Sequence, residues 1–383
     1  MRFSRIRLEN WRNFGTVNVE LQNRAFLVGA NASGKSNFLD AFRFLRDIVV
    51  PGGGFIDAVE RRGGVSRLRN LAARRNPDIV LEVDLTEDEK ISWRYRIAFG
   101  QDKNRRPILK AEKVWNQEGR LILSRPDDDD EHDRERLRQT YLEQVFANKD
   151  FREIKQFFES VHYSHLVPQL IRDPDRWTGK QSDPFGEDFL ERIASVTERS
   201  QRARLRRIEE VLKIAIPQLS NLSLERDERG IPHLRGNYRH WRPTGAWQNE
   251  ADFSDGTLRL IGLLWALQEG SGPLLLEEPE LSLHPGVVRY LPQLIQQVHR
   301  LAKVSARQLF VSTHSYEMLQ DEGIGADEVL LFITSDEGTT IKRGADDSEI
   351  LQELDSGFTM AEAVMSRTEP TGIRQLALPL KER

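Results

Sequence analysis

The sequence predicts an α/β fold in which a mixed or parallel β-sheet is accompanied by an antiparallel β subdomain and a helical insertion. Three observations predict it. A compact apolar strand, Ala25–Gly29, leads through a glycine-rich turn into an amphipathic helix, Ser36–Val49. Two later segments, Pro273–Glu280 and Gln308–Ser315, each contain an apolar strand that ends in polar side chains, as strands of open α/β sheets do at a ligand site. Hairpin-like runs and a charged, helix-prone segment lie between these regions.

The elements follow in order along the chain. Short strands are expected at Arg5–Glu9 and Val17–Leu21, before the strand that ends at Gly29. The helix that follows is expected to end at the run from Pro51 to Gly54, because proline and consecutive glycines break helices. Charged turns separate four further β-type runs that suit antiparallel hairpins: Ile79–Leu85, Ile91–Phe99, Ile108–Trp115 and Leu121–Leu123.

Changes in composition divide the chain into four parts. Residues 1–125 are the first part of the α/β unit, and residues 126–213 are a charged helical insertion or arm that begins with four consecutive acids. Residues 214–360 complete the unit, and residues 361–383 are expected to be a loose tail.

Composition excludes several classes of protein. The chain has 383 residues, no cysteine and a net charge of −4, with 38 % hydrophobic and 30 % charged residues. A disulfide scaffold, a thiolate zinc site and a cysteine nucleophile are therefore excluded. No apolar run approaches the roughly 20 residues of a membrane helix. We expect a soluble, cytoplasmic protein without membrane partners.

The turn between the first apolar strand and its helix fits the pattern GxxxxGK[ST]. Backbone N–H groups of such a loop surround phosphate oxygens, and the following helix N-terminus adds a positive dipole. The lysine reaches the β- and γ-phosphates and the serine hydroxyl binds Mg²⁺. The predicted nucleotide-binding residues are Gly29, Ala30, Asn31, Ala32, Ser33, Gly34, Lys35, Ser36 and Asn37.

Acids and a histidine stand at the ends of the two later strands. Glu277 is expected to support Mg²⁺, together with Ser36, and Glu278 to polarise an attacking water. His314 is expected to contact the γ-phosphate. Each has an ordinary structural alternative, namely a solvated acidic turn and a histidine bonded to neighbouring backbone. Because the same chain also contains a phosphate-binding loop, catalytic roles are favoured for Glu278, His314 and Lys35.

A third polar turn, Phe253–Thr257, precedes the apolar helix Leu258–Leu267. Ser254 is a candidate N-cap. The functional interpretation is a second helix N-terminus directed at phosphate, with Ser254, Asp255 and Gly256 as nucleotide-binding residues.

These elements, in this order, resemble the ABC-type ATPases of the RecF/SMC kind. Residues 29–36 resemble the Walker A loop, 253–257 the signature motif, 274–278 Walker B, 280–284 the D-loop, and His314 the switch histidine. The resemblance covers roughly residues 1–100 and 214–335. It departs from the commoner pattern at Asp255, which replaces a glycine, at Thr257, which replaces a glutamine, and at Glu277, which replaces an aspartate.

The resemblance implies a P-loop NTPase head of ABC type that binds and hydrolyses ATP with Mg²⁺. It implies head-to-tail dimers, or higher oligomers, in which ATP lies between Walker A of one subunit and Ser254 of another. It also implies action on DNA in repair or anti-phage defence, with any nuclease or other effector on a separate chain. Two alternatives stay open: a cytosolic ATPase subunit of a transporter, and an ATP-dependent scaffold with marginal hydrolysis.

Two arginine-rich stretches are candidate contacts for a nucleic-acid backbone. The first comprises Arg61, Arg62, Arg67, Arg69, Arg74 and Arg75, and the second comprises Arg199, Arg202 and Arg206 on one helix face. The alternative for the second is a solvated helix balanced by Glu198, Glu209 and Glu210, whereas the first stretch has fewer acids nearby. His162 and His165 stand three residues apart without a third metal ligand, which favours structural histidines.

Overall fold

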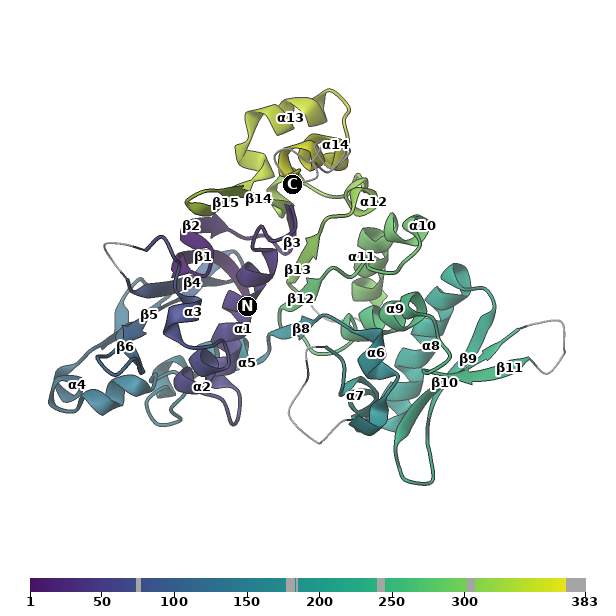
Figure 1. The fold of residues 1–383 in the computed structure, drawn as a ribbon, viewed down its shortest axis with the longest axis horizontal. Helices are drawn as coiled ribbons and strands as arrows, with labels where there is room; N and C mark the ends of the chain where they lie inside the picture. Colours follow the sequence, from purple (N-terminus) through teal and green to yellow (C-terminus); the bar gives the residue numbers. More distant parts are fainter. Residues whose placement is uncertain (74–76, 177–182, 184, 240–244, 302–306, 370–383) are drawn as a thin grey trace, which may run out of the picture.

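Three β-sheets organise the chain in a computed structural model that describes residues 1–73, 77–176, 183, 185–239, 245–301 and 307–369 (Figure 1). The first sheet is antiparallel, with strand order β2-β1-β4-β5-β6-β7. The predicted hairpins are thereby confirmed. Its strands are β1 (Arg2–Trp11), β2 (Phe14–Glu20), β4 (Ile79–Glu87), β5 (Lys90–Gln101), β6 (Pro107–Asn116) and β7 (Leu121–Arg125).

The second sheet is the predicted mixed sheet, and its strand order is β15-β14-β3-β13-β12-β8. All neighbouring pairs are parallel except the β14–β15 hairpin. Its strands are β3 (Arg24–Gly29), β8 (His162–Ser164), β12 (Leu274–Glu277), β13 (Leu309–Thr313), β14 (Val329–Ser335) and β15 (Gly338–Arg343). The carboxyl ends of β3, β12 and β13 therefore meet at one edge, where ligands bind in open α/β sheets.

A small antiparallel sheet, ordered β11-β10-β9, lies at the far side of the molecule from the first sheet (Figure 1). Its strands are β9 (Leu219–Arg226), β10 (Pro232–Tyr238) and β11 (Ala246–Asn249). The main helices are α1 (Lys35–Val49), α5 (Arg152–Glu159), α7 (Phe189–Ser195), α8 (Glu198–Ala215), α9 (Asp255–Ala266), α11 (Leu291–Leu301) and α13 (Ser348–Asp355). The shorter helices are α2 (Phe55–Glu60), α3 (Val65–Leu68), α4 (Asp128–His132), α6 (Pro168–Ile171), α10 (Pro285–Val288), α12 (Tyr316–Leu319) and α14 (Met360–Met365).

The mixed sheet is covered on both faces, because alternate side chains of a strand point to opposite sides. On β3, Leu27 belongs to the core that contains the first sheet, α1 and α5, whereas Phe26 and Val28 belong to the core that contains α8, α9 and α11. The continuous apolar run of β3 in the sequence reflects this burial on two sides.

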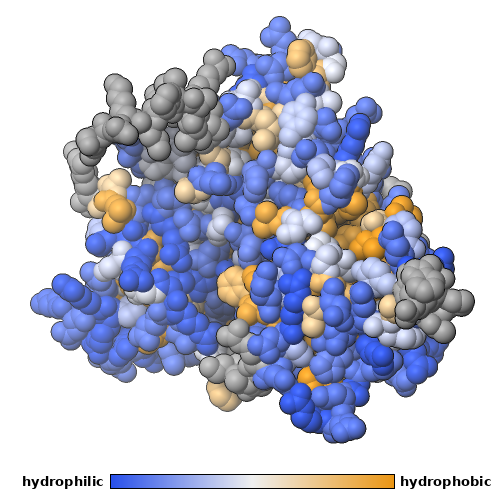
Figure 2. Space-filling view, turned by 45° about the vertical axis from the view of Figure 1, so that its right-hand side comes forward, coloured by the Kyte–Doolittle hydropathy of each residue, from blue (hydrophilic) through white to orange (hydrophobic). Residues whose placement is uncertain are grey.

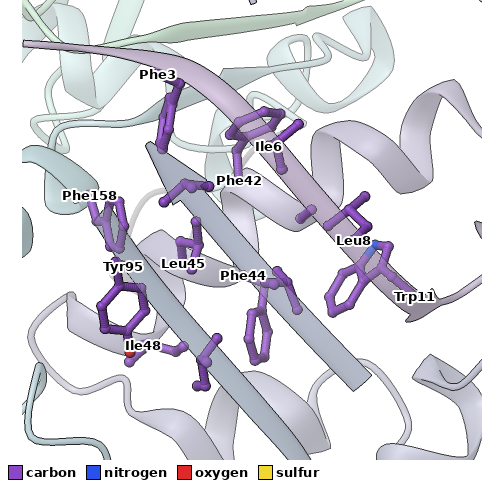
Figure 3. Close-up of a cluster of buried hydrophobic side chains, with 14 of the residues drawn as sticks. Phe3, Ile6, Leu8, Trp11, Phe42, Phe44, Leu45, Ile48, Tyr95 and Phe158 are labelled. Carbon is purple, nitrogen blue, oxygen red and sulfur yellow. The ribbon is translucent and has the colours of Figure 1, made fainter. Parts of the chain in front are cut away.

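Helix α1 fills the space beside the first sheet with aromatic side chains. Phe42 meets Phe3 of β1 edge-on, with ring centroids 4.8 Å apart, and Phe44 stacks on Phe99 of β5 at 5.4 Å. Figure 3 shows Phe42, Phe44, Leu45 and Ile48 of this helix directed into the same cluster as Trp11 and Tyr95. The packing fixes the helix that starts at the glycine-rich turn against a rigid sheet.

The charged middle segment contributes a strand and buried side chains to the core, which its composition does not indicate. Residues 162–164 form β8, which pairs in parallel with β12 and extends the mixed sheet. Phe158 of α5 stacks on Phe3 with ring centroids 5.9 Å apart. The segment is thus partly integral to the core, while its division from the rest at residues 126 and 213 stays a prediction.

The expected loose tail begins as ordered structure. Helix α14 runs from Met360 to Met365, and its residues Ala361, Ala363 and Val364 are buried. The sequence pattern does not predict this short helix, because polar residues follow its few apolar ones. The remaining part of the predicted tail, residues 370–383, lies outside the described residues.

Within the described ranges, no helix combines the length and the apolar character that a membrane span requires. The face drawn in Figure 2 is mostly hydrophilic and is interrupted by a few apolar groups.

Candidate functional site

The glycine-rich turn between β3 and α1 is shaped by residues with positive φ. Ala32 has a φ of 61° and Gly34 a φ of 101°. A Cβ at Gly34 would lie only 2.1 Å from Asn13 Nδ2, so this position accepts no side chain. The first turn of α1 carries no acidic residue that would neutralise its dipole. The turn therefore offers backbone N–H groups and a helix N-terminus to an anion.

Asn13 and Thr339 hold the turn from outside. Asn13 Nδ2 donates hydrogen bonds to the Ser33 carbonyl oxygen at 3.1 Å and to Thr339 Oγ1 at 2.8 Å. Thr339 Oγ1 donates to the same Ser33 oxygen at 2.8 Å, and Asn37 Nδ2 donates to Asn13 Oδ1 at 2.8 Å. No local pattern reveals these two supporting residues, because Thr339 is 306 positions away from Ser33.

We predict that Gly34→Ala weakens nucleotide binding at least tenfold. The added methyl group would collide with Asn13 and the positive φ would be strained by about 1 kcal/mol, so the loop must move. The measurement is titration with a fluorescent ATP analogue, alongside thermal unfolding. Gly119→Ala is the matched control, since Gly119 also has a positive φ, of 73°, but nothing lies within 4 Å of its Cβ. Equal nucleotide affinity in both variants would contradict the prediction.

Lys35 is enclosed by the turn that precedes it. Its side chain is 6 % exposed, and Nζ donates to the carbonyl oxygens of Gly29 at 2.7 Å and Ala30 at 3.0 Å. Burial lowers the pKa of Lys35, although the charges of Glu278, Glu280 and Glu277 oppose that shift. An anion in the loop would compensate the cost of burying this ammonium group.

Glu277, the last residue of β12, contacts the glycine-rich turn. The Ser36 hydroxyl donates a hydrogen bond to Glu277 Oε1, and the Tyr163 hydroxyl donates one to Glu277 Oε2. Both carboxylate oxygens are therefore engaged. Burial and the adjacent Glu277 charge raise the pKa of Tyr163, so it stays a hydrogen-bond donor. The sequence predicts that Ser36 and Glu277 act together at a magnesium ion, but it does not indicate Tyr163. The strand that carries Tyr163, β8, has only three residues and gives no strand signal.

Glu278 and His314 come together at the ends of β12 and β13. Glu278 has a φ of 44°, an uncommon backbone conformation for a non-glycine residue, and its N–H donates to the Ser312 carbonyl oxygen at 3.1 Å. His314 Nδ1 lies 3.4 Å from Glu278 Oε1. The strained backbone turns this carboxylate away from the strand direction and toward the histidine.

Glu280 supports the same corner from a buried position. Thr313 Oγ1 donates to Glu280 Oε1 at 2.6 Å, and the His314 N–H donates to the same oxygen at 3.3 Å. Burial raises the pKa of Glu280, which these hydrogen bonds only partly counter. Glu280 therefore fixes the backbone conformation at His314.

The third polar turn forms a separate site on α9. Ser254 is the N-cap, since its hydroxyl accepts a hydrogen bond from the Thr257 N–H at 3.2 Å. Arg172 holds Asp255 in an ion pair of 2.6 Å. A Cβ at Gly256 would lie 2.5 Å from the Ser282 carbonyl oxygen. Among the described residues, no hydrogen bond or ion pair joins residues 254–256 to residues 29–37, so these two predicted parts of the site do not meet within one chain.

A protein family described as "AAA domain, putative AbiEii toxin, Type IV TA system" matches residues 24–319. This range contains the glycine-rich turn, Glu277, Glu278 and His314. The chain belongs to this AAA_21 family. It is accordingly an AAA-type P-loop ATPase domain.

Similarity to individual proteins is more limited. The chain is 37 % identical over 90 residues to "Endonuclease GajA" of Bacillus cereus (strain VD045). That match covers 24 % of this chain and 14 % of GajA, so it spans only a small part of either protein.

One solved SMC head structure shares the fold of this AAA_21 member. The SmcHead bound to the C-winged helix domain of ScpA superposes with a TM-score of 0.56 at 14 % identity, covering 89 % of this chain and 98 % of that one. An SMC head domain from Thermotoga maritima gives a TM-score of 0.46 at 14 % identity, with 90 % and 99 % of the two chains covered. The first likeness confirms the RecF/SMC-like head fold that the sequence motifs predict.

His162 lies on β8, and His165 follows this strand directly. Burial and the charge of Arg192 lower the pKa of His162 well below its usual range, so its ring is neutral. His165 Nδ1 lies 3.2 Å from the Glu277 carbonyl oxygen. The described residues contain no cluster of three or more histidine or acidic side chains suited to a metal ion.

Proposed function

We propose that the chain is an ATP-binding and ATP-hydrolysing switch. The observation that carries the proposal is the hydrogen bond from Ser36 to Glu277, because it joins the phosphate-type loop to the acidic end of β12. Two acids, one histidine and one enclosed lysine then surround the space above the sheet edge, as phosphoryl transfer to water requires.

Each side chain has a distinct part in this proposal. Lys35 and the backbone N–H groups of residues 30–36 bind the β- and γ-phosphates and neutralise charge that develops on them. Glu278 orients the attacking water and accepts its proton. His314, 3.4 Å from Glu278, contacts the γ-phosphate and holds the same water.

The Ser36 hydroxyl and the Glu277 carboxylate fit a magnesium ion. Both are oxygen donors, which Mg²⁺ prefers, and Mg²⁺ is usually held by one or two protein groups together with phosphate oxygens and water. Bound there, the ion would supply charge neutralisation at the phosphates.

We further propose that the site is completed by a second copy of the chain. Ser254 and the N-terminus of α9 form no hydrogen bond or ion pair with the glycine-rich turn of their own chain among the described residues, and Ser254 is exposed. A head-to-tail pair would place this helix terminus against the γ-phosphate bound by the partner. ATP would then hold the two copies together, and hydrolysis would release them.

A mixing experiment tests both the enzyme activity and the shared site. Lys35→Ala and Ser254→Asp are each expected to be inactive, the second because its carboxylate repels phosphate while still capping α9. An equal mixture is expected to recover about one quarter of wild-type ATP hydrolysis, because half of the dimers are mixed and each has one intact site. Ser254→Asn, which caps without a charge, is the matched control.

Two outcomes would contradict the shared site. An inactive mixture would show that Lys35 and Ser254 do not act across a dimer. An active Ser254→Asp variant would show that no phosphate approaches α9. Mass determination with and without ATP should show dimers of the wild type only when ATP is present.

We also propose a nucleic-acid partner and a role in repair or defence. A relative that matches over 90 residues is named an endonuclease, and the family description mentions a toxin of a type IV system. ATP hydrolysis measured with and without duplex DNA tests the partnership, and unchanged turnover would oppose it. Any effector would be a separate chain under this proposal.

A further inference from the structure

An arginine-lined cleft lies behind the nucleotide site, on the outer side of α1. Its volume is about 770 Å³, and six arginines line it: Arg12, Arg43, Arg46, Arg61, Arg62 and Arg67. Three acids, Asp40, Asp47 and Glu60, also line it. The size falls within the range of ligand pockets, and the charge of the walls selects an anion.

Half of these arginines are already paired. Arg62 contacts Asp40 at 2.9 Å and Asp47 at 2.8 Å, Arg12 contacts Asp40 at 3.0 Å, and Arg61 contacts Asp57 at 2.7 Å. Burial disfavours ionisation of Asp40, but the charges of Arg62 and Arg12 outweigh it and lower the pKa of this carboxyl. Arg62, prominent in the basic stretch of the sequence, is thus a structural residue.

Within the described ranges, the other three arginines are not held in direct ion pairs, although the charge of nearby Asp47 partly opposes the lowering of the Arg46 pKa. Arg43, Arg46 and Arg67 form no ion pair with any residue in the described part of the chain. Burial lowers the pKa of Arg46. Keeping a partly buried guanidinium group without a counter-ion is costly, and a bound phosphate would remove that cost through charge-assisted hydrogen bonds.

Arg43 connects this cleft to the nucleotide site. Its guanidinium carbon lies 4.1 Å from the centroid of the Tyr163 ring, which is a cation–π arrangement. The hydroxyl of the same Tyr163 donates to Glu277, and Glu277 accepts from Ser36. A contact made at Arg43 therefore reaches the carboxylate beside the glycine-rich turn through one side chain.

We propose that the cleft binds phosphates of a single nucleic-acid strand and that Arg43 and Tyr163 transmit its occupancy to Glu277. A strand is favoured over a compact anion because the cations along the cleft are spread from α1 to exposed Arg67 and would meet several successive phosphates. Phosphate that attracts Arg43 away from the ring loosens the hold of Tyr163 on Glu277. The second half of this proposal rests on the proposed nucleotide site, whereas the first half does not.

Binding to the cleft is tested without nucleotide. A fluorescein-labelled 20-nucleotide single strand is titrated with the full chain, and anisotropy is followed over a range of salt concentrations. Arg46→Gln/Arg67→Gln is expected to weaken binding about tenfold and to reduce the slope of log K against log salt by about 1.4, because two phosphate contacts are lost. Arg199→Gln/Arg206→Gln is the matched control, since both residues are exposed arginines without an ion pair to described residues, on α8.

The outcomes separate the alternatives. Equal losses in the two double variants, or a larger loss in the α8 variant, would overturn the cleft as the binding site. Tripolyphosphate is added as a competitor. Displacement of the strand at equal phosphate concentration would show that the cleft takes a small anion, which would also overturn the proposal.

The link to the nucleotide site is tested by the affinity for a fluorescent ATP analogue in the presence of Mg²⁺. In the wild type, the saturating strand is expected to raise this affinity about fivefold. Tyr163→Phe keeps the ring for Arg43 and removes the hydroxyl, so it is expected to bind the strand but to lose the response. An unchanged response in this variant, or none in the wild type, would overturn the link. Failure of any analogue to bind would instead remove the proposed nucleotide site and leave the strand result standing.

Discussion

Replacing Lys35 by alanine is expected to weaken ATP binding by at least about 100-fold, since the two or more charge-assisted hydrogen bonds lost are worth about 1.5–3 kcal/mol each. The ammonium group is enclosed by the carbonyl oxygens of Gly29 and Ala30, and the surrounding acids would repel a triphosphate without it. Calorimetric titration with ATP and Mg²⁺ measures the loss.

The control for this variant is Lys103→Ala, which removes an exposed lysine in the β5–β6 turn. It should bind ATP as the wild type does. Circular dichroism and thermal unfolding establish that Lys35→Ala is folded, and its loss of a buried charge should not lower its stability. Wild-type ATP affinity in a folded Lys35→Ala protein would remove the phosphate-binding role of the loop.

Replacing Glu278 by glutamine is expected to lower ATP turnover about 1,000-fold, because general base catalysis contributes roughly 10²–10⁴. The amide keeps the shape of the side chain but cannot accept a proton from water. ATP binding should persist, so the variant should accumulate as an ATP-bound dimer. Single-turnover kinetics and mass determination with ATP measure the two effects separately.

Glu322→Gln, an exposed acid in the turn before β14, is the matched control and should hydrolyse ATP normally. Turnover near the wild-type rate in Glu278→Gln would assign the proton transfer to another residue. A monomer at saturating ATP would leave Glu278 as a catalytic residue but would argue against a nucleotide shared between two copies.

Much of this fold follows from local patterns in the sequence. The strand that ends at Gly29 and the helix that follows it are predicted within one residue, because apolar periodicity and a glycine-rich turn mark both boundaries. The four strands between residues 79 and 125 are predicted because charged turns separate four β-type runs. Ser36 and Glu277 are predicted to act together, and the structure places them in contact.

Other parts of the site depend on contacts between distant positions. Tyr163 lies on a strand of three residues, and only its pairing with β12 brings it to Glu277. The pairing of Arg62 with Asp40 and Asp47 changes the meaning of the basic stretch, since charge in the sequence does not show which cations are already compensated. Arg74 and Arg75 of that stretch lie outside the described residues.

The hydrogen bond from Thr339 to the Ser33 carbonyl oxygen has a consequence for biogenesis. The loop emerges early during translation, yet one of its supports is made 306 residues later. Contacts of such sequence separation form slowly, since chain closure must precede them. The contacts that hold the proposed nucleotide-binding loop are therefore complete only after residue 339 has been synthesised, and we expect the loop to be less firmly held in a shorter nascent chain.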